Sequence, residues 1–452
     1  MGISNLIFLL LLIVTVVLFV QRVKFIRGNI LLGKPLDLSD NPSARWKKMF
    51  RVAMGQSKMT VRPISGLLHI FVYLGFVIIN LEMLEIVLDG LLGTHRLFSQ
   101  MIGGYYKSFI NVFETLALLV FVSCLVFLVR RNVIKLKRFW SKEMTSWPRS
   151  DANIILIVEC FLMAAFLTMN AADGALQMAN VEDLRRFMLE YYSGVEMAGS
   201  GFLISSFIAP ILPTDFESLA LIERICWWFH ISGVLAFLVY VTYSKHLHIF
   251  LAFPNTYYSK LQPKGQLNNL ASVKKEVELM MNPSADPYAT PPPSELEDEL
   301  PSFGAKEVTD LSWKQLMDSY SCTECGRCTS VCPANLTGKI LSPRKVMMDT
   351  RDRLEEYSAG KSTNGRNFDD GKKLLGDYIT SEELWACTSC NACTDACPIL
   401  IDPLSIIVDL RRSLVMEDSA APTELNGMFS NIENNGAPWQ FAQADRLNWK
   451  DE

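Results

Sequence analysis

The sequence lacks the basic surplus that is typical of nucleic-acid-binding proteins. Its 43 lysines and arginines are outnumbered by 47 aspartates and glutamates, and the formal net charge is −4. This balance argues against nucleic acid as a partner. Cysteine is also scarce, with 11 in 452 residues, which excludes a disulfide-rich secreted scaffold. Nothing in the chain resembles a nucleophile, an acid–base pair or a nucleotide cradle.

Charged residues make up only 20% of the chain, whereas 50% of it is hydrophobic. Almost all of the long apolar runs fall before about residue 252, and the remainder has an ordinary polar composition. This uneven distribution excludes both a purely soluble enzyme and a pure membrane channel. The length by itself suggests two to four domains.

Five segments are long and apolar enough to cross a bilayer, which takes about 20 helical residues. They are 3–20, 66–89, 108–130, 152–171 and 219–243. We expect the last to continue as helix toward Phe250. The first lacks a basic start and a cleavage site, so we expect a retained helix rather than a secretion signal. The loop 172–218 is expected to form short helices on the outer face.

Positive charge in the loops predicts the orientation of these helices. Lysine and arginine are concentrated between the first and second spans and between the third and fourth, while the other two loops carry few. The positive-inside rule then places the N-terminus outside and the segment after the fifth span in the cytoplasm. The sequence therefore predicts a multi-pass protein of the bacterial inner membrane.

Four of the five histidines lie in or at the ends of the second and fifth predicted spans. His69, His246 and His248 fall at the same cytoplasmic depth. His230 and His248 are 18 positions apart, which is five turns of a continuous helix, so both would point the same way and His246 elsewhere. Imidazoles on facing helices suit axial ligation of b-type haem. We predict His69 and His248 as one ligand pair, with His230 and His246 as weaker candidates.

An intramembrane histidine can equally well bond a neighbouring backbone carbonyl or serine. His230 would need a partner near the outer side, where the second span offers Asn80 but no histidine. His95 could supply one only by folding back from the outer loop. The sequence therefore favours one haem near the cytoplasm over two.

Carboxylates also occur within the predicted spans. A charge at such depth is costly, so an intramembrane acid is a functional candidate by default. Glu82, Glu114 and Glu159 are candidates for carrying protons or hydrogen-bonding a quinone. The alternative is a place at the outer interface, above all for Glu85.

Two cysteine motifs carry the most specific signal in the chain. Each has the spacing C-x₂-C-x₂-C-x₃-C-P, at Cys322, Cys325, Cys328 and Cys332 and again at Cys387, Cys390, Cys393 and Cys397. This is the bacterial ferredoxin pattern for [4Fe–4S] clusters, in which the fourth thiolate turns away to the other cluster. The predicted ligands of cluster one are Cys322, Cys325, Cys328 and Cys397. Those of cluster two are Cys387, Cys390, Cys393 and Cys332.

Zinc is the competing metal, but it would use paired C-x₂-C units rather than two full copies that each end in Cys-Pro. Cluster thiolates need a reducing compartment, which agrees with the orientation from loop charge. Each of Cys124, Cys160 and Cys226 lies in an apolar helix and is expected to be a core residue.

The second half of the chain has helical spacing around these motifs. The segments with this spacing are Asp310–Tyr320, Leu341–Tyr357, Gly371–Leu384 and Ile401–Val415. They predict a helical dicluster domain, and with the spans an all-α protein: a five-helix transmembrane bundle followed by a helical ferredoxin-like domain. The run from Asn282 to Pro301 is rich in proline and acids, which indicates an exposed linker.

The predicted domains are a membrane domain at 1–253, a linker at 254–305, a dicluster domain at 306–421 and a polar tail at 422–452. Trp439 and Trp449 in the tail suggest docking onto a partner, or else they fold back on the chain.

Residues 60–253 resemble the membrane (gamma) subunit of respiratory nitrate reductase and its relatives. The match is closest in the run from Trp228 through His230 to Ser244-Lys-His246-Leu-His248. That family holds two haems with two histidines on each of helices two and five. The resemblance implies that His69 and His248 bind the haem nearer the cytoplasm. His230 matches a ligand of the distal haem, whose partner this sequence lacks.

Residues 302–415 are similar to the iron–sulfur subunit of heterodisulfide reductase and to membrane iron–sulfur oxidoreductases linked to electron-transfer flavoprotein. Phe303-Gly-Ala-Lys306, both cysteine motifs and the segment 409–415 carry the likeness. It implies a separate subunit with a CCG domain, or a flavoprotein, that binds near residues 423–452. It also implies menaquinone as a plausible acceptor.

Together these features predict an electron-transfer subunit. Electrons would pass between a cytoplasmic redox partner and membrane quinone through two [4Fe–4S] clusters and haem b. The alternatives are a subunit of a heterodisulfide-type reductase and a haem-free iron–sulfur membrane anchor. A redox-driven ion pump would rest only on the buried glutamates.

Overall fold

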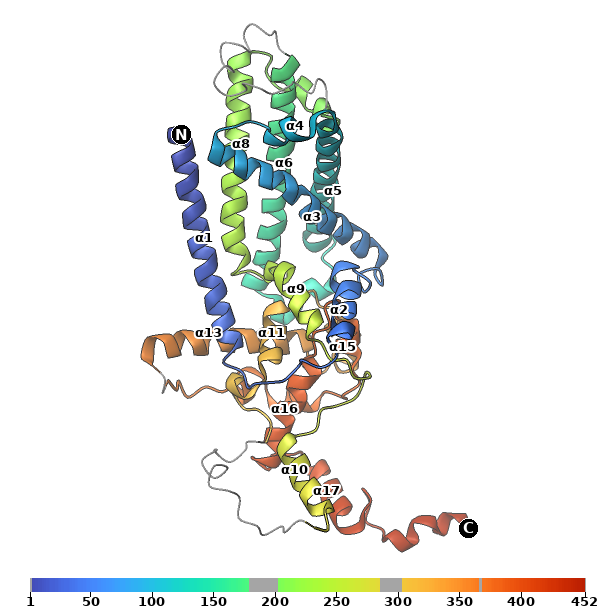
Figure 1. Ribbon diagram of the computed structural model, residues 1–452. Helices are drawn as coiled ribbons and strands as arrows, with labels where there is room; N and C mark the ends of the chain where they lie inside the picture. Colours follow the sequence, from blue (N-terminus) through green and yellow to red (C-terminus); the bar gives the residue numbers. More distant parts are fainter. Residues whose placement is uncertain (1, 179–201, 285–302, 366–367, 452) are drawn as a thin grey trace.

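The computed structural model describes residues 2–178, 202–284, 303–365 and 368–451 (Figure 1). Within these ranges the chain is helical, and its only β pairing consists of two isolated bridges. Long helices form an upright bundle, and most of the shorter helices gather at one end of it (Figure 1). The predicted all-α fold is confirmed.

Five helices in the described ranges are long and apolar enough to span a membrane, as the sequence predicts. They are built on α1 (Ile3–Ile30), α3 (Pro63–Leu92), α5 (Tyr106–Asn132), α6 (Trp147–Met178) and α8 (Phe216–Val241). Large apolar side chains face outward along them, for example Leu10 and Phe161, which are 63% and 60% exposed. Such side chains suit contact with lipid, so the chain is a membrane protein.

Helix α5 packs between α3 and α6, and α6 packs against α8. Helix α1 contacts both α3 and α8. Gly90 allows the close approach of α1, because a Cβ atom there would meet the Phe8 ring at 2.7 Å. The Nδ2 atom of Asn5 also donates to the Gly90 carbonyl at 2.8 Å. The first helix is therefore an integral part of the bundle.

The fifth span does not continue as helix to Phe250, which corrects the sequence prediction. Helix α8 ends at Val241, and Ser244 is extended before the 3-10 turn η7 (Lys245–Leu247) and α9 (His248–Tyr257). Asp151 on α6 fixes this break, because it accepts from the Tyr240 hydroxyl at 2.6 Å and from the Lys245 amide at 3.1 Å. A carboxylate that binds the freed backbone stabilises the interruption.

The shorter helices are α2 (Pro42–Met49), α4 (Leu97–Ile102), α10 (Ala271–Met281), α11 (Trp313–Ser321), α12 (Pro333–Leu336), α13 (Pro343–Asn364), α14 (Ser381–Trp385), α15 (Ala392–Ala396), α16 (Pro403–Met416) and α17 (Thr423–Asn435). Helices α11, α13 and α16 agree with three of the predicted segments. The fourth prediction, one helix over Gly371–Leu384, is wrong. Gly376 has a φ of 103° and Leu375 is extended, so the chain makes a turn there and only α14 is helical.

Part of the predicted outer loop, residues 179–201, and part of the predicted linker, residues 285–302, lie outside the described residues. The described end of the loop forms two 3-10 turns, η5 (Ser205–Phe207) and η6 (Ala209–Ile211). Helices α9 and α10 occupy positions that the sequence assigned to the linker. Asn255 in α9 is fully buried, so α9 is packed, whereas α10 is mostly exposed.

The end of the bundle contributes to the hydrophobic core of the short helices, while the spans have a core of their own. Ile26 of α1 and Leu247 of η7 pack in the same cluster as Leu316 of α11 and Val346 of α13. Polar contacts cross the same boundary, since the Asn29 amide donates to the Tyr320 hydroxyl at 2.8 Å. The iron–sulfur half of the sequence is therefore seated directly on one end of the membrane bundle (Figure 1).

Candidate functional site

The two cysteine motifs fold alike. Glu324 and Gly326 flank Cys325 with φ of 54° and 69°, and Ser389 and Asn391 flank Cys390 with φ of 55° and 61°. Left-handed residues are uncommon and turn the chain sharply. Their recurrence at matching places shows that the motifs are structural repeats, each curling around its first three thiols.

The fourth cysteine of each motif leaves this curl. Cys332 and Cys397 are extended, with φ and ψ of −71° and 118° and of −70° and 125°. The cause is local, because the ring of a following proline disfavours helical backbone at the residue before it. The chain is thereby redirected at each Cys-Pro step, and α12 begins at Pro333.

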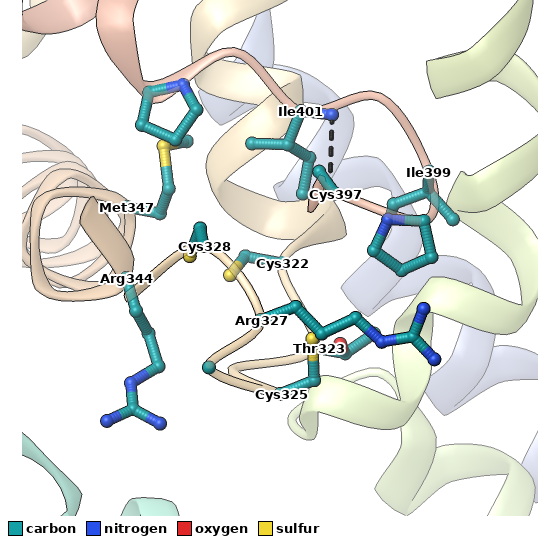
Figure 2. Close-up of a pocket in the computed structure, with 13 residues that line it drawn as sticks. Cys322, Thr323, Cys325, Arg327, Cys328, Arg344, Met347, Cys397, Ile399 and Ile401 are labelled. Carbon is teal, nitrogen blue, oxygen red and sulfur yellow. Dashed lines mark hydrogen bonds between the residues drawn. The ribbon is translucent and has the colours of Figure 1, made fainter. Parts of the chain in front are cut away.

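Cys397 lines one pocket together with Cys322, Cys325 and Cys328. Figure 2 shows these three on one loop and Cys397 arriving from a separate segment. In the other group, Cys332 lies close enough to Cys387 to interact with it electrostatically, as do Cys390 and Cys393. The structure thus places the fourth thiol of each motif with the first three of the other, the exchange that the sequence predicts.

The thiols fit iron as their ligand partner. Burial raises the pKa of Cys322, Cys393 and Cys397 to about 12, so a lone thiolate there would be costly without a bound cation. Backbone amides also point at sulfur, from Ile401 to Cys397 at 3.3 Å and from Ser389 to Cys387 at 3.4 Å. Such N–H···S bonds are a recognised means of tuning cluster potentials.

Three arginines that sequence reasoning did not single out surround these thiols. Arg411 donates to the carbonyl of Leu384 at 3.0 Å and to that of Cys387. Arg327 lines the first pocket and donates to the Lys58 carbonyl at 3.0 Å. The only sequence signal was indirect, because Arg411 falls in the segment that resembles heterodisulfide reductase.

Arg344, the third arginine, is fully buried and connects the first motif to the loop between α5 and α6. It donates to the Arg138 carbonyl at 2.6 Å and to Glu143 at 2.7 Å. Its guanidinium also lies where a Cβ atom on Gly326 would come, at 2.6 Å. The absence of a side chain at Gly326 thus allows the arginine to pass behind the cluster loop.

The structure brings His69, His246 and His248 together, although His246 was expected on a different side from His248. The rings of His246 and His248 are 5.4 Å apart, centre to centre, and His69 lies close enough to interact electrostatically with both. The break after α8 explains the difference, because η7 and α9 redirect both side chains.

The chemistry of this histidine trio fits a haem iron. His248 Nδ1 lies 3.1 Å from the Lys245 carbonyl, which fixes the tautomer that leaves Nε2 free to bind a metal. His69 Nδ1 is buried without a hydrogen-bond partner among the described residues. Buried imidazole nitrogens that are free of protein partners are suited to axial ligation.

The histidine trio also lies against the first cysteine motif. Lys245, next to His246, forms an ion pair with Glu324, next to Cys325. Arg327 is near enough to His69 to influence it electrostatically. The histidine trio at this end of the membrane bundle thus lies next to the loop that bears Cys322, Cys325 and Cys328.

His230 lies away from that end and is almost fully buried. Its Nδ1 lies 2.9 Å from the Leu162 carbonyl, and its Nε2 lies 3.3 Å from the sulfur of Met83. The His95 ring is directed to Asp173, at 3.3 Å. The suggestion that His95 folds back to serve His230 is therefore not what the structure shows.

The buried carboxylates of α3 and α5 belong to a polar network around Arg96. Glu82 pairs with Arg96 at 3.1 Å, and Asn170 bonds both Arg96, at 2.6 Å, and Glu114, at 3.2 Å. Glu85, for which a place at the outer interface stays a prediction, is buried within the protein and accepts from the Tyr106 hydroxyl at 2.8 Å. Neutralisation of these acids by protein partners favours a structural role, whereas Glu159 on α6 is only partly buried.

Comparison with known proteins identifies the segment that contains both cysteine motifs. Residues 321–400 match the model of the 4Fe-4S dicluster domain family. The chain carries a 4Fe-4S dicluster domain. No solved structure matches the chain.

Two similarities run almost the length of the chain. The "Probable iron-sulfur-binding oxidoreductase FadF" of Bacillus subtilis is 27% identical over 99% of this chain and 61% of its own length. The "EtfAB:quinone oxidoreductase" of Syntrophomonas wolfei is 26% identical over 92% of this chain and 55% of its own length. The chain thus spans between 55% and 61% of the length of these two relatives.

A shorter similarity connects the chain to a component of the dihydromethanophenazine:CoB–CoM heterodisulfide reductase of Methanosarcina acetivorans. The identity is 28% over 33% of this chain and 36% of that protein. The predicted relationship to iron–sulfur oxidoreductases of both kinds is confirmed. With its dicluster domain and these relatives, the chain is an iron–sulfur electron-transfer protein.

Proposed function

We propose that this chain is the membrane-anchored electron-transfer subunit of a quinone-linked oxidoreductase. Electrons would pass between a cytoplasmic redox partner and the membrane quinone through two [4Fe–4S] clusters and haem b. The observation that carries the proposal is the seating of the histidine trio, His69, His246 and His248, against the first cysteine motif. Electron transfer through a protein requires redox centres that lie close together. The contact between the histidine trio and the first cysteine motif would bring a haem close to cluster one.

The two mixed groups of cysteines would hold the clusters. Cys322, Cys325, Cys328 and Cys397 would bind cluster one, and Cys387, Cys390, Cys393 and Cys332 cluster two. When bound, such clusters supply reversible one-electron chemistry. The protein's part is to hold the thiolates, to exclude water by burial, and to place amides and arginines beside the sulfur atoms.

His69 and His248 would be the axial ligands of one haem b at the same end of the bundle. His246 lies against His248 and remains a secondary candidate, as does His230. The fit rests on the free Nε2 of His248 and the unpartnered Nδ1 of His69. A haem held here would lie within the bundle and on the side of the first motif.

The quinone would be reduced or oxidised within the bilayer, and menaquinone is a plausible form. Glu159 is the stronger proton-carrying candidate, because Glu82 and Glu114 are already engaged in the Arg96 network. A related protein is described as an EtfAB:quinone oxidoreductase, which supports quinone as the membrane partner. The cytoplasmic partner would be a flavoprotein or a CCG-domain unit bound near the exposed tail, with the N-terminus outside.

The test is spectroscopic and uses the purified full chain. A pyridine haemochrome assay should find about one haem, and His69→Ala and His248→Ala should each lose it. His230→Ala removes another buried intramembrane imidazole and tests the secondary candidate: we expect the haem to be retained, and its loss would make His230 a ligand. A preparation without any haem would support the alternative of a haem-free iron–sulfur membrane anchor. Zinc in place of iron would contradict the proposal.

A heterodisulfide-type reductase is the second candidate, because one relative is part of a heterodisulfide reductase. The two functions differ in their substrate. Reduction of a quinone analogue by the reduced chain with its co-purified partner supports the proposal. Reduction of a disulfide without quinone turnover supports the alternative.

A further inference from the structure

A basic cavity opens at the end of the membrane bundle that carries the dicluster domain. Its volume is about 480 Å³, and it is formed by the start of α3 and by the end of α5 with the segment that follows. Four cations line it, namely Arg62, Arg130, Lys137 and Arg138. No carboxylate is among the lining residues.

Four positive charges in one cavity repel one another unless an anion compensates them. Within the described ranges, none of the four makes an ion pair with a carboxylate. Arg62 and Arg130 instead donate to neutral hydroxyls, those of Ser330 at 2.7 Å and of Ser65 at 3.2 Å. The Nε atom of Arg138 is buried and has no hydrogen-bond partner among the described atoms. The missing counter-charge must come from outside the described chain.

The position of the cavity indicates the kind of anion. It lies where the candidate membrane spans Pro63–Leu92 and Leu97–Asn132 both end, which is the depth of lipid headgroups. Apolar side chains on the segments that form it are strongly exposed, with Ile64 of the lining at 65% and Val133, which follows α5, at 72%. Lipid chains can cover such residues, whereas a free ion cannot.

From this arrangement we propose that the cavity binds the phosphate headgroup of an anionic phospholipid. The arginines bind the phosphodiester oxygens, the first turn of α3 adds its free amides, and the acyl chains lie along Ile64 and Val133. Basic pockets between membrane helices commonly bind anionic headgroups. The proposal is independent of the electron route, because it uses neither the cysteines nor the histidines.

The site also contacts the dicluster domain. Ser330, the partner of Arg62, lies between Cys328 and Cys332, and the Arg138 carbonyl accepts from Arg344 behind the first motif. A bound lipid would thus screen the charges of Arg62 and Arg138, which contact the first cysteine motif and its neighbour Arg344. We infer that the lipid helps to seat the dicluster domain on the bundle.

The test uses delipidated full chain in detergent, with native mass spectrometry and the thermal unfolding midpoint as measurements. Three probes are titrated: dioctanoyl phosphatidylglycerol, dioctanoyl phosphatidylcholine and inorganic phosphate. We expect phosphatidylglycerol alone to form a one-to-one adduct and to raise the midpoint. Equal binding of phosphatidylcholine would overturn the proposal. If inorganic phosphate displaces phosphatidylglycerol with equal affinity, the ligand is free phosphate and the lipid proposal is wrong.

The double variant R130Q/K137Q should weaken phosphatidylglycerol binding by about fivefold for each lost charge. The matched control K135Q/K142Q removes the same charge from the same loop, outside the cavity lining, and should bind as the unchanged chain does. An equal loss in the control would show mere surface attraction and overturn the site. If the double variant does not fold, the exposed Lys137→Gln alone should still weaken binding about fivefold.

Discussion

The ammonium of Lys245 is ion-paired with the carboxylate of Glu324, and both side chains are buried. The pair joins the turn before His246 and His248 to the loop between Cys322 and Cys325. Glu324 also accepts from Arg351 at 2.9 Å, so one carboxylate balances two cations. Burial lowers the pKa of Lys245 and opposes its charge, whereas the two cations hold the pKa of Glu324 below its usual value.

Glu324→Gln should therefore loosen the seat of the dicluster domain. Lys245 and Arg351 would each lose one partner but keep Asp151 and Asp352, so the cost should fall below the ~3–5 kcal/mol of breaking an isolated buried pair. The thermal unfolding midpoint should fall, and, if the proposed electron route holds, haem reduction through the clusters should slow. The control is Glu382→Gln on the exposed face of α14. Equal midpoints for both variants would contradict a structural role for the pair.

Gly326→Ala should disturb the first cysteine group selectively. The substitution adds a Cβ atom 2.6 Å from the Arg344 guanidinium, at a φ of 69° that other residues rarely adopt. Iron analysis should show a fall from about eight atoms per chain toward about four. Gly427→Ala on α17 meets no atom within 4 Å and should change nothing. Loss of both clusters would mean that the two groups assemble together.

Arg411→Gln should lower the reduction potential of the second cluster. The guanidinium lies beside Cys387, where its charge favours the reduced state, which is one unit more negative. A redox titration followed by electron paramagnetic resonance measures the change. Arg412→Gln removes a neighbouring charge that is bonded to Asp409 instead. A potential that moves equally in both variants would contradict a local effect.

Asp349→Asn should change how stability depends on pH. Burial raises the pKa of Asp349 to about 6, against the partial compensation of Lys345. Because the folded state binds this proton more tightly, Asp349 favours folding below pH ~4 and loses that effect as pH rises through ~6, on the order of 2 kcal/mol. The thermal midpoint of the unchanged chain should fall over this window, and that of the variant less. Asp369→Asn, at an exposed carboxylate that does not act on Asp349, should keep the full slope.

Sequence reasoning found what local chemistry determines. The spacing of the cysteines and the proline after each fourth one fix the motifs, and runs of apolar residues fix the five long helices. The resemblance of the chain to iron–sulfur oxidoreductases was evident from the same residues. These features depend on neighbours along the chain, which a sequence displays directly.

What the sequence could not show depends on distant partners. Helix α8 stops because Asp151, some 90 positions earlier, binds Tyr240 and the Lys245 amide, and helical spacing contains no sign of this. The turn at Gly376 likewise interrupted a segment that has helical periodicity. Arg344 and Arg411 were missed because an arginine becomes notable only when its burial and its carbonyl partners are known.

The hydrophobic core that Ile26 and Leu247 share with α11 and α13 bears on how charge is relayed. A carrier on a loose arm must diffuse between donor and acceptor, and its speed depends on viscosity and arm length. An electron carrier that is packed directly against its acceptor does not have to diffuse. The turnover rate of this protein should then be insensitive to solvent viscosity once the partner is bound. It should depend instead on the fixed distances between the redox centres.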